Sequence, residues 1–174
     1  MKIEIFTEGS GTTGDLESVE QVKDYFKGNF LPVKDLANEI SRTGDVTIHI
    51  FSDDHGYLLG SDSTSVLESP QGNRSKAEFK RSLTESSSAA DITVILLTTT
   101  TFKDVVTSQW SDLVYNADQD SIWCIGASDS ALSSVDIDEL ESSVRSAIIY
   151  KRVGVAPIDI SAKQKLIDAL TANI

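Results

Sequence analysis

The stretch Ile92-Thr93-Val94-Ile95-Leu96-Leu97 decides the fold. It is an unbroken run of β-branched residues and leucine, which is typical of a parallel strand that is buried on both faces of its sheet. Apolar strand-like runs also occupy residues 2–7, 46–51, 121–126 and 148–155. We therefore expect a single α/β domain over residues 1–174, with three α/β/α layers around a doubly wound, mainly parallel sheet of five strands.

Helical patterns fill the gaps between these runs. Expected helices cover residues 15–27, 33–41, 76–90, 104–117 and 136–146, and a last one begins at Ser161. Asp15 or Ser18 would cap the first of them, and Ser75 would cap the third. Residues 60–75 contain glycine, serine and proline and are expected to form a long loop.

Charge composition excludes one class of function. The chain has a net charge of −12, with 17 aspartates and 10 glutamates against 15 lysines and arginines. No dense cluster of basic residues is present, so a broad nucleic-acid-binding face is not expected. Acidic proteins of this kind stay dispersed in concentrated salt, which predicts a halophilic source, an archaeon or an archaeal virus. An ordinary acidic cytosolic protein is the alternative.

Other features bear on the cellular compartment. The sequence has no apolar run of 18 residues and starts directly with a strand pattern, so we expect a cytoplasmic protein that does not enter a membrane. Cys124 is the only cysteine, which excludes an internal disulfide and a thiolate metal cluster. Its apolar neighbours predict a buried, inert thiol.

Polar loops follow the strands at residues 7–15, 52–57, 98–101 and 127–130, and we expect them to share the ligand-binding edge of the sheet. In the first loop, Ser10, Gly11, Thr12, Thr13 and Gly14 have the small side chains of a cradle for an anionic group. A flexible connector is the alternative. From the later loops, Thr99, Ser128 and Asp129 are expected to contact the ligand.

The second loop, Ser52-Asp53-Asp54-His55-Gly56, follows a buried strand and supplies the candidate catalytic residues. His55 is the candidate acid, base or ligand donor, with Ser52 beside it. A histidine that only caps its turn is the alternative. Asp53, Asp54 and Gly56 are expected to contact ligand, and no metal site is predicted because adjacent aspartates in so acidic a chain are usually solvated. His49, within the strand, is expected to be a core histidine.

Two segments resemble a known family. Asp24-Tyr25-Phe26-Lys27-Gly28-Asn29-Phe30 and Ile50-Phe51-Ser52-Asp53-Asp54-His55-Gly56-Tyr57-Leu58 resemble the small YaaA-like proteins, whose functions are largely unknown. The resemblance covers residues 1–60 and extends to Tyr25, Gly28, Ser52, His55 and Gly56. It implies a parallel sheet similar to that of uracil-DNA glycosylases, in a domain found beside enzymes that modify bases in tRNA or DNA. The loop with cysteine and lysine that these proteins carry after the first strand is replaced here by residues 7–15.

The expected function is a small-molecule-binding domain, with or without catalysis, for a nucleotide, nucleobase or modified base whose anionic group sits in the first loop. No cofactor is identified. One alternative is a non-catalytic structural or regulatory protein that binds a protein partner or a second copy of itself. A second is a flavodoxin-like FMN binder, because residues 10–15 resemble its phosphate loop. Two helical segments between the first two strands speak against it, and so does the lack of evident aromatic residues to stack on a flavin, with Trp110 and Tyr115 as the remaining candidates.

Overall fold

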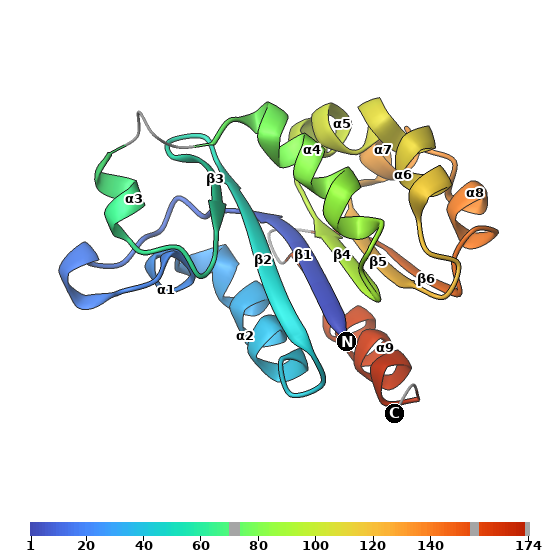
Figure 1. Cartoon of the computed structure of the whole chain (residues 1–174), viewed down its shortest axis with the longest axis horizontal. Helices are drawn as coiled ribbons and strands as arrows, with labels where there is room; N and C mark the ends of the chain where they lie inside the picture. Colours follow the sequence, from blue (N-terminus) through green and yellow to red (C-terminus); the bar gives the residue numbers. More distant parts are fainter. Residues whose placement is uncertain (70–73, 154–156, 173–174) are drawn as a thin grey trace.

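The computed structural model describes residues 1–69, 74–153 and 157–172. A six-stranded sheet with the order β3-β2-β1-β4-β5-β6 forms its centre (Figure 1). The strands are β1 (Lys2–Glu8), β2 (Asp45–Ser52), β3 (Gly56–Leu59), β4 (Ile92–Leu96), β5 (Ile122–Ala127) and β6 (Ser146–Lys151). β3 is antiparallel to β2, and the other neighbouring pairs are parallel. The expected α/β fold with a mainly parallel sheet is confirmed.

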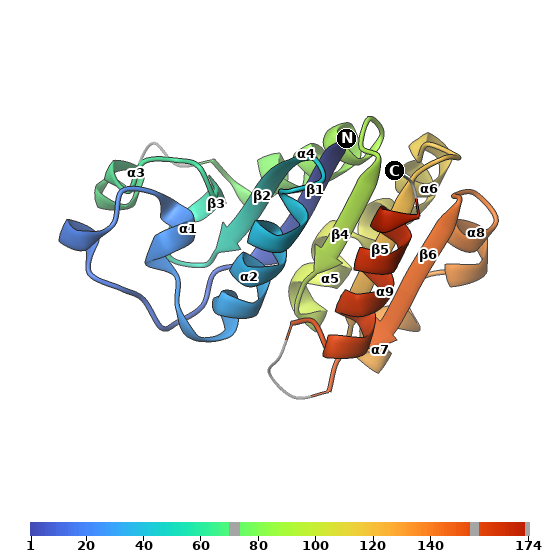
Figure 2. The same ribbon diagram turned by 90° about the horizontal axis from the view of Figure 1, so that it is seen from below.

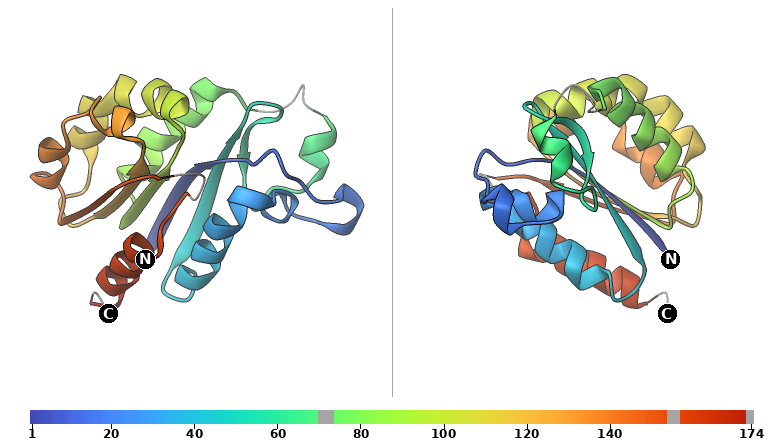
Figure 3. Two further views of the ribbon diagram at one scale, coloured as in Figure 1. Left: turned by 180° about the vertical axis from the view of Figure 1, so that it is seen from behind. Right: turned by 60° about the vertical axis from the view of Figure 1, so that its left-hand side comes forward.

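Helices cover both faces of the sheet. One face carries α2 (Leu31–Ile40) and α9 (Ile160–Thr171), and the other carries α4 (Lys76–Ser87), α5 (Thr99–Val105), α6 (Trp110–Asn116), α7 (Asp129–Leu132) and α8 (Ile137–Glu141). Figure 2 shows α2 and α9 in front of the strands, and the right-hand view of Figure 3 shows the sheet between the two helical layers. The remaining elements are α1 (Val22–Tyr25), α3 (Ser65–Glu68) and the 3-10 turns η1 (Leu16–Ser18), η2 (Gly28–Phe30) and η4 (Thr107–Gln109).

The core is divided in two by the sheet. Ile3 and Ile5 point to the layer of α2 and α9, whereas Phe6 points to the layer of α4 to α8. The same alternation runs along β4, where Val94 and Ile95 are both fully buried but on opposite faces. A strand covered on both sides needs apolar residues at consecutive positions, which explains its unbroken apolar sequence.

The sixth strand, β3, corrects the expected count of five. No strand was expected at residues 56–59, but they turn back and pair with β2, from Ser52 opposite Gly56 to His49 opposite Leu59. Gly56 has φ 75°, the left-handed conformation in which a three-residue hairpin loop commonly ends. The strand is only four residues long, too short for a visible period-two pattern.

The helix expected over residues 15–27 was also wrong. Only η1 and α1 form, because backbone groups in this region bond to other segments instead of to a helix. The amides of Val22 and Lys23 donate to the carbonyls of Asp62 (2.9 Å) and Gly60 (3.0 Å). Residues 12–14 likewise pair with residues 25–27 around a bridge between Thr13 and Phe26. Residues 12–27 therefore form a side lobe beside β3, at the left of Figure 1.

The other boundaries differ in detail. The helix expected over 104–117 is divided into α5, η4 and α6, and that over 136–146 is reduced to α8. Residues 60–75 include α3, with positions 70–73 outside the described residues. Ser75 does cap α4, in a reciprocal capping box with Glu78. The last helix is capped by Asp159, not by Ser161. β6 ends at Lys151, although the strand was expected to reach 155, and residues 154–156 lie outside the described part.

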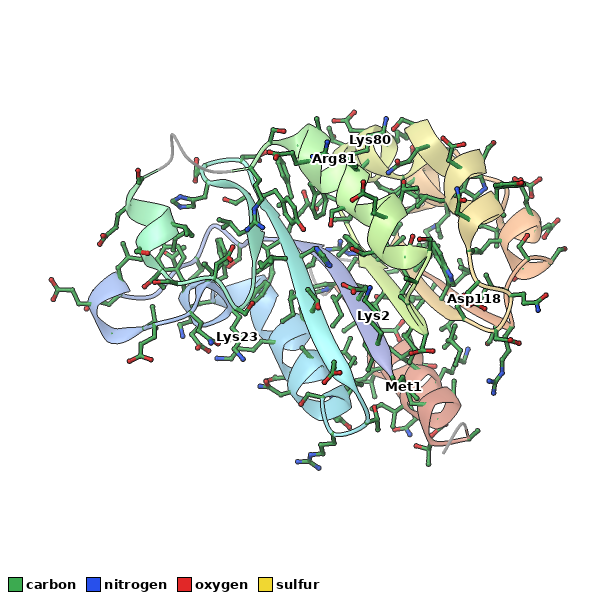
Figure 4. The ribbon with its side chains drawn as sticks, viewed as in Figure 1. Met1, Lys2, Lys23, Lys80, Arg81 and Asp118 are labelled. Atoms are coloured by element: carbon green, nitrogen blue, oxygen red, sulfur yellow. The ribbon has the colours of Figure 1, made fainter. Side chains whose placement is uncertain are left out.

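Charged side chains are distributed over the outer helical surfaces (Figure 4). Lys80 and Arg81 project from α4 away from the sheet, and Arg81 lies near Glu78 and Glu85 of the same helix. These basic residues thus belong to a solvated helix face with intrahelical ion pairs. Among the described residues, no helix has the length and apolarity that a membrane span requires.

Candidate functional site at the carboxyl edge of the sheet

Strand order creates a crevice between β1 and β4. The chain leaves β1 towards α2 on one face of the sheet, and it leaves β4 towards α5 and α6 on the opposite face. Adjacent parallel strands whose connections diverge in this way form a topological switch point, where ligands of open α/β sheets bind. The loops after β1, β2, β4 and β5 all lie at this edge, as their strands are parallel.

A pocket of about 180 Å³ occupies this switch point. Its polar lining residues are Thr7, Glu8, Ser10, Asn29, Thr98 and Arg152, and Gly9 and Gly11 lie among them. A second pocket, also of about 180 Å³, shares Thr98 and Arg152 with the first and is further lined by Leu97, Thr99 and Ser128. Arg152 therefore lines two adjoining pockets.

Glu8, the last residue of β1, is held in place by the loop after β4. The backbone N–H of Thr98 donates to Glu8 Oε2 at 2.6 Å, and the hydroxyls of Thr98 and Thr101 donate to Oε1 at 3.0 and 2.6 Å. These bonds fix the carboxylate on the pocket wall and join β1 to the start of α5. Within the described residues, no cationic side chain forms an ion pair with it.

Arg152 is the functional candidate that sequence reasoning missed. The expected strand over 148–155 placed it inside the sheet, but β6 ends at Lys151 and Arg152 lies at the carboxyl edge. Its backbone N–H donates to the carbonyl of Ala127 at 2.8 Å, and the residue lines both pockets. In the described part of the chain, its guanidinium forms no ion pair. The signal in the sequence was a basic pair, Lys151 and Arg152, directly after an apolar strand.

Hydroxyl groups form the rest of the rim. Thr99 and Ser128 place their hydroxyl oxygens 2.5 Å apart, and Ser128 also caps α7 by accepting from the N–H of Ala131 at 3.2 Å. The Ser10 hydroxyl contacts the carbonyls of Thr12 (2.7 Å) and Lys27, which fastens the first loop to the side lobe.

The predicted ligand residues are thus only partly brought together. Ser10 and Gly11 line the first pocket, and Thr99 and Ser128 line the second. Thr12, Thr13 and Gly14 belong to the segment that pairs with residues 25–27, outside both pockets. Asp129 is exposed and lies 3.5 Å from Lys151 Nζ. The cradle expected from residues 9–15 leads into a 3-10 turn and not directly into an α-helix.

The residues of the β2–β3 hairpin lie outside these two pockets. Ser52 is 8% exposed and pairs with Gly56 across the hairpin, while Asp53 and Asp54 are exposed on the turn. His55 is half-buried, with its ring edge-on to Tyr25 at a centroid distance of 6.1 Å. Catalysis by His55 and Ser52 remains a prediction.

A buried polar chain crosses the sheet further from the edge. His49 is 4% exposed and lies with Nε2 2.5 Å from Glu4 Oε2 and with Nδ1 2.7 Å from the Tyr57 hydroxyl. The Tyr57 oxygen is in turn 2.9 Å from Ser82 Oγ on α4. His49 is therefore the core histidine that was expected, with partners that the sequence did not reveal.

Burial raises the pKa of three groups that do not themselves line the pocket. The pKa of the Cys124 thiol rises to about 12, chiefly because burial disfavours the thiolate. Burial also raises the pKa of Tyr57 and of Tyr150. Cys124 is consequently a poor nucleophile, as its apolar neighbours predicted. Over the described ranges, no three His, Cys, Asp or Glu side chains are grouped closely enough to hold a metal ion.

No protein-family model matches the sequence, and no curated protein is significantly similar to it. Among solved structures, the fold is similar to a D319A mutant of the PilB minor pilin from Streptococcus sanguinis, with a TM-score of 0.46 and 8% identity. The match covers 98% of this chain but only 60% of the pilin chain. A similarity of that size carries no argument about function.

Proposed function

We propose that this protein is a small-molecule-binding domain whose ligand places an anionic group against Arg152, in the pocket between β1 and β4. The observation that carries the proposal is an arginine without an ion pair in the described structure, on the wall of a pocket at the switch point of the sheet. A guanidinium offers five N–H donors in a planar fork, which matches the oxygens of a carboxylate or phosphate.

The size of the pocket limits what it encloses. Drug-sized ligands occupy roughly 300–1,000 Å³, whereas this pocket measures about 180 Å³. A compact carboxylate or phosphate fits inside. A nucleotide, the ligand class expected from the sequence, would seat only its phosphate there, with the base outside the pocket.

The two alternative functions receive less support from the geometry. Trp110 is 7% exposed and its indole N–H donates to the Asp136 carbonyl at 3.2 Å, so its ring faces the core and not a flavin. Tyr115 is exposed but lies on α6, in the helical layer and outside both pockets. An interaction protein needs no polar pocket at the switch point, and the presence of one favours ligand binding.

Thermal-shift measurements test the proposal. Inorganic phosphate, propionate, AMP and FMN are compared at equal ionic strength with chloride, which controls for screening. At least one of them is expected to raise the melting temperature of the wild-type protein, because a ligand that binds only the folded state stabilises it. Arg152→Gln should remove that shift.

His55→Ala is the matched variant for the site predicted from the sequence. It should retain anion binding within about threefold, since His55 lies outside the pocket; a factor of three is under 1 kcal/mol. Loss of binding in His55→Ala together with normal binding in Arg152→Gln would move the site to the β2–β3 hairpin and overturn the proposal. Absence of any anion-dependent shift would overturn it as well.

A further inference from the structure

The anion pocket also contains a fixed negative charge. Glu8 lies on its wall, and the three hydrogen bonds from Thr98 and Thr101 hold the carboxylate in one orientation. An ionised carboxylate has about four lone-pair sites, so Oε2, which accepts one bond here, retains acceptor capacity. In the described parts of the chain, no lysine, arginine or histidine neutralises it by an ion pair.

Glu8 and Arg152 line the same pocket without forming an ion pair with each other. Two opposite charges in the lining of one small pocket attract a ligand that carries both signs of charge. A purely anionic ligand would neutralise Arg152 but would also be repelled by Glu8, so it should bind more weakly than a ligand with both charges. A purely cationic ligand would be attracted by Glu8 and repelled by Arg152.

The lining also has an apolar part, formed by Phe30, Leu96 and Pro157, next to the polar residues Thr7 and Asn29. Phe30 is 1% exposed, and Pro157 is buried. Together with a volume of about 180 Å³, this wall suits a short aliphatic or unsubstituted group and excludes a large side chain.

We infer that the ligand is a small zwitterion of the α-amino-acid class, with its carboxylate on Arg152, its ammonium group on Glu8 and a short side chain against Phe30 and Pro157. This inference rests on the proposed function, because it assumes that Arg152 receives the anionic group. It adds a second charged contact and thereby names the substrate class.

Isosteric probes separate the two charges. L-alanine carries both groups, lactate replaces the ammonium group with a hydroxyl, propionate has the carboxylate alone, and ethylamine has the ammonium group alone. Calorimetric titration of the wild-type protein should give alanine at least tenfold tighter binding than lactate or propionate. Ethylamine should bind at least tenfold more weakly than alanine.

Variants assign the two contacts. Glu8→Gln should weaken alanine at least tenfold and leave lactate binding equal or stronger, and its retained lactate binding would show that the pocket is intact. Arg152→Gln should weaken alanine and lactate alike. Glu17→Gln, an exposed glutamate on η1 outside the pocket, changes the net charge equally and should bind alanine as the wild type does.

The outcomes separate this inference from the proposed function. Equal affinity for alanine and lactate, both lost in Arg152→Gln, would overturn the zwitterion and leave the anion pocket in place. A Mg²⁺-dependent shift lost in Glu8→Gln, with no preference for alanine, would assign Glu8 to a cation and also overturn the inference. No binding of any probe by the wild-type protein would overturn both.

Discussion

His49 illustrates how a polar residue is accommodated inside this sheet. Its ring stacks on Phe6 with a centroid distance of 4.2 Å, and both of its nitrogens have partners, the Glu4 carboxylate and the Tyr57 hydroxyl. Lys2 Nζ lies 3.3 Å from the other oxygen of Glu4. A buried polar group costs little only when its hydrogen bonds are made, so the members of this chain depend on one another.

His49→Ala should therefore destabilise the fold by about 3 kcal/mol, because it leaves the buried Glu4 carboxylate and the Tyr57 hydroxyl without their main partner. Urea unfolding of the variant checks the value. His55→Ala, at a half-buried position on the hairpin, should cost about 1 kcal/mol or less. Equal losses in the two variants would contradict the distinction between a core histidine and a rim histidine.

Cys124 makes stability depend on pH in the alkaline range. Burial raises the pKa of its thiol from an ordinary value of 9.0 to about 12 in the folded chain. The unfolded chain therefore ionises first, and the stabilisation is complete below pH 9 and lost as pH rises towards 12. At pH 10.5 the lost contribution should be about 2 kcal/mol relative to pH 8.

Denaturant unfolding of the wild type and of Cys124→Ala at both pH values measures this contribution. The variant should lose less stability on going to pH 10.5, although it starts lower at pH 8 because of the missing sulfur atom. Tyr57 and Tyr150 also have raised pKa values and act in the same direction in both proteins. Because charge on Cys124 contributes to the raised pKa of Tyr150, the difference between the proteins reports the thiol together with this coupling. Identical alkaline losses would show that Cys124 is not responsible.

At the scale of elements, β5 and β6 are packed through a glycine. Gly126 lies beside Tyr150 in the strand pairing, and a Cβ at position 126 would overlap the tyrosine ring. The Tyr150 hydroxyl donates to the carbonyl of Pro157, so the ring links the last strand to the segment that forms the pocket wall. The glycine is required here by close approach and not by a special backbone conformation.

Gly126→Ala should consequently cost about 2 to 3 kcal/mol through overpacking. Gly11→Ala is the matched control, since a Cβ there meets no atom within 4 Å, and its stability should change by no more than about 0.5 kcal/mol. In a Tyr150→Ala background the cost of Gly126→Ala should fall sharply, as the two positions share one contact. An unchanged cost in that background would refute the proposed overlap. Melting curves of the single and double variants supply the data.

At the scale of the whole molecule, the net charge of −12 is the dominant feature. Several carboxylates are paired on the surface, for example Asp24 with Lys34 and Glu39 with Lys163. Because acidic residues number 27 against 15 basic residues, at least 12 carboxylates have no basic residue to pair with one to one. Repulsion among these carboxylates opposes the compact state and is reduced by salt.

The melting temperature should therefore rise by about 5 °C or more between 0.1 and 2 M KCl, equivalent to roughly 2 kcal/mol of relieved repulsion. Sucrose, which favours burial without screening charge, is the control and should give a smaller increase. A melting temperature independent of KCl would contradict the prediction of salt adaptation. Calorimetry across the salt series provides the measurement.

The sequence by itself determined the layers, because burial on two faces requires unbroken apolar strands and helices carry their own periodicity. Residues 92–97 and the helix beginning after Ser75 are examples in which a local pattern was sufficient. Short elements were missed because they contain too few residues to form such a pattern. The four residues of β3, for example, show too little periodicity to be recognised as a strand.

Only the tertiary structure decided the candidate site. Glu8 and Arg152 are far apart in the chain, and they share a pocket because β1 lies beside β4 and because β6 ends one residue before the arginine. The same holds for Glu4 and His49, which meet through the parallel register of β1 and β2. Strand order and register arise from packing between distant segments, and no local spacing of residues encodes them.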